Sequence, residues 1–333
     1  SYTIINSGNP KFTFIIIIST LFVKRDIFTH EVFTLKLPYK KLTNEFMKFS
    51  SPLFVFNIIA IVIGLFDIWL LQKMSGSIET GFYGLAYSIA AMCFLFTGAM
   101  TPIITREFSK YYEKKDIQEI KKLFKRYIPM LYSVAAYFGV FISFESENLI
   151  GIFADEKFKD AYLALVIMAF YPIHQTYGQL SGSLFFAMEE TKLYKNIGIL
   201  SSLVGLLLSF IFLYVLELGA VGFAWKMVLI QAVSVNIQLY YNVKLLSIKM
   251  LPFLIHQLVS VVFFVLLAYV STQLIFTSYS GLLVFLLKGA FYTIMVLIGT
   301  IFIPYIFATN KQELRDFWQN IKTKFKRNKR IGE

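Results

Sequence analysis

Long apolar runs alternate with short polar segments along almost the whole chain. A helix of about 20 apolar residues spans the roughly 30 Å hydrocarbon core of a bilayer, and the runs lack the two-residue alternation of a membrane β-barrel. We therefore predict an all-α integral membrane protein, a polytopic helix bundle of about nine transmembrane helices. The expected crossings are 11–23, 51–72, 81–105, 128–148, 159–187, 194–216, 219–243, 252–274 and 281–307.

Basic residues gather in every second segment between these helices. Most of the 32 Lys and Arg lie in 24–50, 106–127, 188–195, 244–251 and the tail after 307. Short cytoplasmic loops collect positive charge, so these segments and the C-terminus are predicted to be cytoplasmic. The first crossing then enters from the outside.

Composition narrows the possible classes of function. The chain is 57% hydrophobic, and its net charge of +12 lies in loops rather than in one basic patch, which argues against nucleic-acid binding. Cys93 is the single cysteine, so neither a disulfide framework nor a zinc or iron cluster is expected. The sequence also lacks a phosphate-binding Gly-rich loop, an HExxH motif and a nucleophile elbow. We therefore assign no catalytic residue, no metal site and no cofactor, and we do not expect an enzyme.

Three charged residues stand deep inside predicted crossings: Asp67, Lys226 and Lys288. Counted from the ends of their helices, all three lie at similar depth in the outer half of the membrane. A charge in hydrocarbon is costly unless it is paired or faces water. Two interpretations stay open: a structural Asp–Lys ion pair with snorkelling lysines, or the polar wall of a substrate cavity or coupling-ion site. The sequence does not say which lysine Asp67 meets.

The predicted helix 159–187 contains the polar stretch YPIHQTYGQLSGS (171–183). Pro172 removes a backbone donor and can kink the helix, and the two glycines allow close packing. A kinked helix with polar groups in mid-membrane is typical of a transporter cavity. Hydrogen bonds that join helices are the alternative for the glutamines, and the imidazole could shuttle a proton. The candidate cavity residues of this helix are His174, Gln175, Tyr177 and Gln179.

Other charged segments are expected at surfaces. Glu145 and Glu147, at the outer end of helix 128–148, are predicted to be solvated. Segments 113–124 and 311–326 carry apolar residues at helical spacing opposite Lys and Arg. This pattern indicates either amphipathic helices on the membrane surface or solvated linkers with a few apolar anchors.

Three blocks, in order, resemble one family of membrane transporters. They are IVIGLFDIWLLQKMSGSIETGFYGLAYSI (61–89), IGIFADEKFKDAYLALVIMAF (150–170) and FFAMEETKLYKNIGILSSLVGLLLSFIFLYVLELGAVGFAWKMV (185–228). Together they are similar to the Wzx-type O-antigen and capsule flippases of the multidrug/oligosaccharidyl-lipid/polysaccharide exporter superfamily. The chain departs from the family pattern at Glu189 and Glu190, where a small residue or Arg is usual, and at Lys226.

The resemblance implies two six-helix lobes around a cavity that opens alternately to either side. This chain would then hold the last helix of a truncated N-lobe (1–23), a cytoplasmic linker (24–50), a six-helix C-lobe (51–245), two additional transmembrane helices (246–307) and a basic cytoplasmic tail (308–333). The first residue is Ser, and no signal peptide precedes the first crossing, which agrees with a truncated N-terminus.

The implied function is a flippase for undecaprenyl-diphosphate-linked oligosaccharide in the bacterial cytoplasmic membrane, serving O-antigen, lipopolysaccharide or capsule biosynthesis. Its partners would be the lipid-linked oligosaccharide, membrane lipids and, as candidates, a polysaccharide polymerase and a chain-length regulator. In this reading Lys226 or Lys288 neutralises the diphosphate, and Asp67 is either their partner or a proton or cation coupling site. The alternatives are a cation-coupled small-molecule antiporter of the same superfamily and a membrane-bound glycan-processing enzyme.

Overall fold

The computed structural model describes residues 39–274, 281–309 and 312. Two predicted segments lie outside these residues: the first crossing, 11–23, and almost all of the amphipathic segment 311–326. Residues from Ser51 onward form one compact unit, which is the part described below.

All regular secondary structure of the described residues is helical, and they contain no strand, so the predicted all-α class is confirmed for them. The α-helices are α3 (Tyr39–Ala91), α4 (Phe94–Glu113), α5 (Ile117–Phe144), α6 (Ser146–Phe153), α7 (Ala161–Met168), α8 (Tyr171–Ala187), α9 (Thr191–Phe210), α10 (Gly219–Leu245), α11 (Leu251–Tyr269) and α12 (Leu282–Phe302). Short 3-10 helices cover Glu156–Phe158 and Pro304–Phe307, and π-helical turns extend α9 over Ile211–Val215 and α11 over Val270–Leu274.

Among the described residues, 6 helices are long and apolar enough to cross a membrane. They cover Lys40–Ala91, Ile117–Phe144, Thr191–Val215, Gly219–Leu245, Leu251–Gln273 and Leu282–Phe302. α4, α7 and α8, which the sequence predicted to belong to further crossings, are not among them. The physical reason is local, because the second half of α4 is charged and the chain between Ala161 and Ala187 is divided into two short helices.

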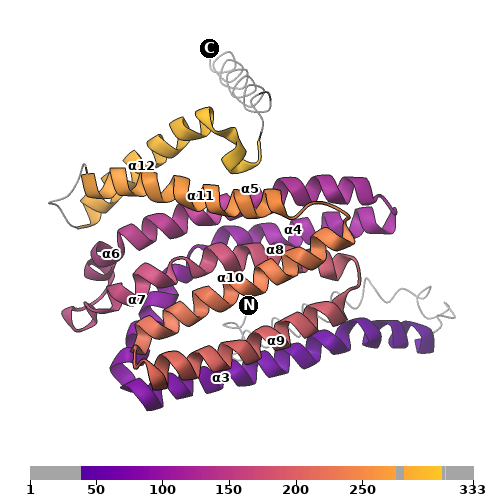
Figure 1. Cartoon of the computed structure of the whole chain (residues 1–333), viewed down its shortest axis with the longest axis horizontal. Coiled ribbons are helices and arrows are strands. Elements are labelled where there is room, and N and C mark those ends of the chain that lie inside the picture. Colours follow the sequence, from indigo (N-terminus) through magenta and orange to yellow (C-terminus); the bar gives the residue numbers. More distant parts are fainter. Residues whose placement is uncertain (1–38, 275–280, 310–311, 313–333) are drawn as a thin grey trace, which may run out of the picture. The chain divides into compact units, whose positions relative to one another are not determined.

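Two of the predicted helix boundaries move. The expected loop between 72 and 81 shrinks to a sharp bend at Gly76 inside α3, where φ is 87° and ψ is 177° (Figure 1). A positive φ of this size favours glycine, since a Cβ would clash with the backbone. The expected continuous helix 159–187 instead breaks at residues 169–170, and Pro172 stands in the first turn of α8. The kink expected at this proline is therefore present as a complete break.

The segment 113–124 is not a surface helix, contrary to one of the two interpretations of its pattern. α4 ends at Glu113, and α5 begins at Ile117 with Asp116 as its N-cap, whose carboxylate accepts the backbone N–H of Glu119 at 3.1 Å. Ile120 is fully buried in the protein core. The apolar stripe faces other helices because the segment is the first part of a long packed helix.

The core of this unit is built around α8, which packs against α4, α5 and α10. α11 lies along α5, and α9 lies along α10 (Figure 1). Large aromatic side chains fill the main core, and Phe108, Phe124, Tyr132, Tyr177 and Phe264 are fully buried there. The polar residues of α8 are therefore held on a helix with neighbours on several sides.

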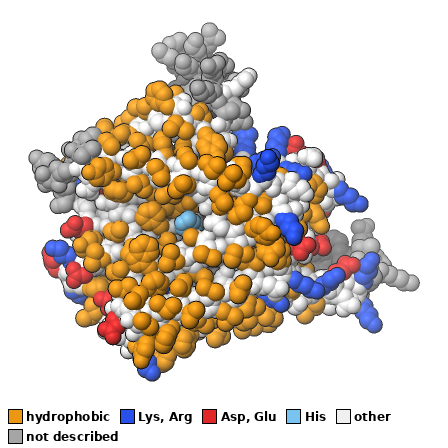
Figure 2. All heavy atoms as spheres, viewed as in Figure 1, with side chains coloured by type: hydrophobic (Ala, Val, Ile, Leu, Met, Phe, Trp, Pro, Cys, Tyr) orange, Lys and Arg blue, Asp and Glu red, His pale blue; other side chains and the backbone are white. Residues whose placement is uncertain are grey.

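Basic side chains mark one end of the helices. The turns between α4 and α5, α8 and α9, and α10 and α11 all lie at that end (Figure 1). Figure 2 shows hydrophobic side chains over the middle of the visible face and Lys and Arg gathered toward this end. An apolar band with a basic end is the charge distribution expected of a membrane-spanning bundle.

Candidate functional site

A buried ion pair joins α3 to α10. The Lys226 ammonium donates to Asp67 Oδ2, and the Ser209 hydroxyl of α9 donates to Asp67 Oδ1 at 2.8 Å. Asp67 is 7% exposed and Lys226 is 4% exposed. The Lys226 Nζ also lies 4.5 Å from the centre of the Phe223 ring. The two charges thus compensate each other, and one further side chain contacts each of them. Without these contacts both charges would be costly to bury.

The second half of α3 fixes the start of α10. After the bend at Gly76, Glu79 Oε2 accepts the backbone N–H of Ala220 at 2.7 Å. A carboxylate at a helix N-terminus satisfies one unpaired donor and complements the helix dipole. Because Lys226 follows two turns later on α10, this contact also sets the height at which its ammonium meets Asp67.

The ion pair lines a cavity of about 400 Å³ between α3, α8, α9 and α10. The rest of the wall combines apolar residues with nine side chains that can both donate and accept hydrogen bonds: Tyr171, Gln175, Gln179, Tyr194, Ser201, Ser202, Gln231, Ser234 and Gln238. Ser201 donates to Ser234 at 2.9 Å, which ties α9 to α10 across the wall. Amide and hydroxyl side chains in such numbers match the hydrogen-bonding groups of a sugar.

The structure divides the candidate residues of α8. Gln175 and Gln179 line the cavity, one helical turn apart. His174 and Tyr177 do not; both face α5, where their rings lie 6.1 Å and 5.5 Å from the ring of Tyr132. The difference follows from the 100° turn between successive helix residues, which sends neighbours in sequence to different faces.

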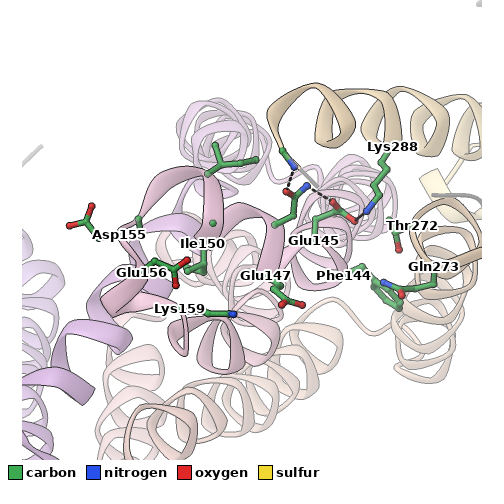
Figure 3. Close-up of a pocket in the computed structure, with 15 residues that line it drawn as sticks. Phe144, Glu145, Glu147, Ile150, Asp155, Glu156, Lys159, Thr272, Gln273 and Lys288 are labelled. Atoms are coloured by element: carbon green, nitrogen blue, oxygen red, sulfur yellow. Dashed lines mark hydrogen bonds and ion pairs between the residues drawn. The ribbon is translucent and has the colours of Figure 1, made fainter. Parts of the chain in front are cut away.

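Lys288 does not meet Asp67. Its ammonium donates to Glu145 Oε1 at 2.9 Å, and the two residues are 7% and 2% exposed. Asn148 donates to the other oxygen of Glu145 at 3.0 Å and accepts the backbone N–H of Gly281 at 2.8 Å (Figure 3). The expectation that Glu145 is solvated is therefore wrong, because α6 packs against the end of α5 and Lys288 and Phe285 of α12 contact it.

This second pair borders a separate pocket of about 660 Å³. Figure 3 shows Glu147, Asp155, Glu156 and Lys159 around it, together with the Glu145–Lys288 pair. No residue of this pocket lines the cavity beside Asp67. The three intramembrane charges of the sequence thus belong to two different sites.

Several cavity residues were missed at the level of the sequence. Gln231, Ser234 and Gln238 follow one another on α10 at spacings of three and four, and they share a wall with Lys226. A polar stripe at helical spacing inside an apolar helix is a readable signal. Ser209, the second partner of Asp67, gives no such signal, because a single serine is common in membrane helices.

The described residues offer no evident metal site. Within 39–274 and 281–309, no group of three or more His, Cys, Asp and Glu side chains is placed to hold a metal ion. The chemistry available in the cavity is hydrogen bonding and charge pairing, which can bind and release a polar ligand.

Comparison with known proteins shows which proteins this chain is similar to. Residues 14–163 match the family of polysaccharide biosynthesis proteins. Over 222 residues the chain is 26% identical to the protein named probable low-salt glycan biosynthesis flippase Agl15 of Haloferax volcanii. The alignment covers 65% of this chain and 45% of that relative, so the chain spans less than half of its length. No solved structure is significantly similar to the chain.

The family match includes two of the three segments that carried the resemblance. Residues 61–89 and most of 150–170 fall inside the family match. Together with the membrane-crossing helices, the match describes a multi-pass membrane protein. The resemblance is therefore confirmed: residues 14–163 are similar to the polysaccharide biosynthesis proteins, and the chain is a distant homologue of a glycan biosynthesis flippase.

Proposed function

We propose that this protein moves a lipid-linked oligosaccharide across a membrane. More specifically, the cargo is an undecaprenyl-diphosphate-linked repeat unit, and it crosses the bacterial cytoplasmic membrane for O-antigen or capsule synthesis. In this form the basic turns and the C-terminus face the cytoplasm. The chain binds and reorients its cargo and performs no covalent chemistry.

One observation carries the proposal: the cavity in which the Asp67–Lys226 pair lies among hydroxyl and amide side chains. A flippase must give the sugar a path on which its hydroxyl groups keep hydrogen-bond partners, because unpaired polar groups are costly in hydrocarbon. The cavity wall supplies amide and hydroxyl groups from α8, α9 and α10. Since the chain spans less than half of its relative, this wall would form one side of the pathway of the whole protein.

The ion pair is the feature of the wall that can respond to cargo. A phosphate oxygen that approaches Lys226 competes with Asp67 for the same ammonium. Release of the carboxylate then frees it to bind a proton or a cation, so the pair would exchange partners as cargo enters and leaves. Lys288 is not assigned this role, because its ammonium is bound to Glu145 outside the cavity.

The test compares the two buried pairs in cells that depend on the full-length protein for surface polysaccharide. Asp67→Asn with Lys226→Met removes both charges of the cavity pair. Glu145→Gln with Lys288→Met does the same to the control pair. We expect the first double variant to be present at normal abundance, to lose surface polymer and to accumulate lipid-linked units inside the cell.

The control double variant should keep both its abundance and its surface polymer. Normal export by the Asp67/Lys226 double variant would refute a transport role for the pair. Loss of export from both variants at normal abundance would also refute it, since a charge pair outside the cavity would then matter equally.

The second candidate, a cation-coupled antiporter of the same superfamily, is favoured by the carboxylate of Asp67 in the cavity wall. An antiporter would lose drug efflux in the Asp67→Asn variant while surface polysaccharide and its lipid-linked precursors stayed unchanged. Measuring both outputs in the same cells separates the two functions.

A further inference from the structure

The hydroxyl group of Ser209 has two acceptors within hydrogen-bond distance, although it carries only one hydrogen. Its oxygen lies 2.8 Å from Asp67 Oδ1 and 3.1 Å from the backbone oxygen of Gly205, which is one turn earlier on α9. Ser209 is fully buried. The hydroxyl can therefore donate to only one of these two oxygens at a time, and rotation about its C–O bond changes which one.

The two side chains that hydrogen-bond Asp67 differ in what they can do. The Lys226 ammonium donates and cannot accept, whereas the Ser209 hydroxyl can do both. An ionised Asp67 needs donors. A protonated Asp67 needs an acceptor for its new O–H group, because a buried donor without a partner is costly. Ser209 is thus the partner that suits both forms of the carboxyl group.

The observed distances allow both forms without a movement of the backbone. With Asp67 ionised, the Ser209 hydroxyl donates to Oδ1 across 2.8 Å. With Asp67 protonated, the carboxyl hydrogen points to Ser209 Oγ across the same contact, and the Ser209 hydrogen turns to the Gly205 oxygen at 3.1 Å. Each O–H group then keeps an acceptor in either form.

The same turn of α9 also lies against the lysine. A Cβ at Gly205 would stand 3.5 Å from Cε of Lys226, so the bare backbone leaves room for the lysine stem. Asp67, Gly205 and Lys226 all line the cavity. A proton or a phosphate that enters the cavity therefore reaches the pair without crossing the protein core.

Few other ionisable groups face Asp67. In the part of the chain that the structure describes, Asp67 and Lys226 are the charged residues of the cavity wall, and α8 and α9 add the phenols of Tyr171 and Tyr194 to it. The second half of α3 contributes Tyr83, whose phenol is close enough to Asp67 to sense its charge. A phenol ordinarily stays neutral near pH 7, so the carboxyl group is the one that can exchange a proton.

A proton suits this site better than a metal cation does. It neutralises Asp67 in place and needs a single acceptor, which Ser209 supplies. A metal cation such as Na⁺ would need several oxygen ligands. It would also lie beside the Lys226 ammonium, whose charge repels it.

We propose that Ser209 is a positioning residue that lets Asp67 alternate between its ionised and protonated forms, and that the coupling ion of the cavity is a proton. A phosphate that binds the Lys226 ammonium leaves Asp67 without its counter-charge. The carboxylate then takes up one proton from water as the phosphate binds, and it releases this proton when the phosphate leaves. The inference rests on the proposed function, because the phosphate is that of the proposed cargo.

The experiment measures the affinity of the purified full-length protein for undecaprenyl diphosphate at constant ionic strength, from about pH 5 to about pH 8. Ser209→Ala removes the hydroxyl, and Ser209→Thr keeps it. Asp67→Asn reports the pH dependence of the probe's own phosphates. The matched control is Ser271→Ala, which alters another fully buried serine, one that donates to the backbone oxygen of Ala268 outside the cavity. All variants must elute as a single folded species.

We expect the affinity of the wild type to rise as the pH falls, because the complex holds one proton more than the free protein. The rise can approach about tenfold per pH unit for one proton, and it should be much smaller in Asp67→Asn. Ser209→Ala should move the rise to higher pH by about one unit, since a hydrogen bond to a carboxylate is stronger than one to a carboxylic acid. Ser209→Thr and the Ser271→Ala control should follow the wild type, and replacing sodium by choline should change nothing.

Three results would overturn the inference. Identical pH profiles of Ser209→Ala and the wild type would remove the role of Ser209. A wild-type profile no steeper than that of Asp67→Asn, or an affinity that depends on sodium, would exclude the proton.

Failure of the inference can be told apart from failure of the proposed function. A wild type that exports surface polysaccharide and binds the probe equally well at every pH would leave the proposed function intact and overturn this inference alone. A wild type that does not bind the probe would overturn both.

Discussion

Replacing Asp67 alone and replacing Lys226 alone should both lower the free energy of unfolding, but by different amounts. Lys226→Met leaves a carboxylate that is 7% exposed and that keeps the Ser209 hydroxyl as its hydrogen-bond donor. An unpaired buried charge of this kind costs about 3–5 kcal/mol. Asp67→Asn leaves the ammonium with an amide oxygen and with the Phe223 ring at 4.5 Å. That contact offsets about 1–2 kcal/mol of the loss.

Removing both charges should restore most of the stability. Asn and Met are neutral and close in volume to the residues they replace, and neutral substitutes for a buried pair are often tolerated. We expect the free energy of unfolding of the double variant to lie within about 1 kcal/mol of that of the wild type. The coupling energy between the two positions is then about 3 kcal/mol or more.

The assay is unfolding by sodium dodecyl sulfate in mixed micelles, followed by helical circular dichroism, for the wild type, both single variants and the double variant. A double variant as unstable as Lys226→Met would refute the reasoning. That outcome would mean that the two side chains stabilise the fold through separate contacts rather than through their mutual charge.

Three further predictions use the same unfolding assay. Glu145→Gln leaves the Lys288 ammonium without its carboxylate and should cost about 3 kcal/mol, and a change below 1 kcal/mol would contradict the ion pair. Gly178→Ala places a Cβ 2.8 Å from a methyl group of α10 and should destabilise the fold by about 1–3 kcal/mol. Gly84→Ala places a Cβ with no atom within 4 Å and should stabilise the fold by about 0.5–1 kcal/mol. The reverse order of the two glycine variants would argue against the α8–α10 packing. Glu79→Ala removes the cap of α10 and should cost about 1 kcal/mol; a cost no larger than that of an exposed Glu→Ala change elsewhere would exclude the cap.

The sequence by itself determined the structural class of the protein and the positions of several helix breaks. Each crossing must match the same thickness of hydrocarbon. The length and apolarity of a helix can therefore be read from its own segment of the sequence. The break before Pro172 and the bend at Gly76 are local as well, since they follow from a missing N–H and a missing Cβ. The same reasoning identified Asp67 and Lys226 as costly charges that need a partner or water.

Tertiary structure decided which groups meet. Asp67 faces Lys226 while Lys288 faces Glu145, and only two of the four candidates on α8 reach the cavity. The rotation of each helix about its axis depends on the side chains of every neighbour at once, and no single segment contains that information. The prediction that Glu145 is solvated failed for the same reason: the cover over the end of α5 comes in part from α12, more than a hundred residues later in the chain.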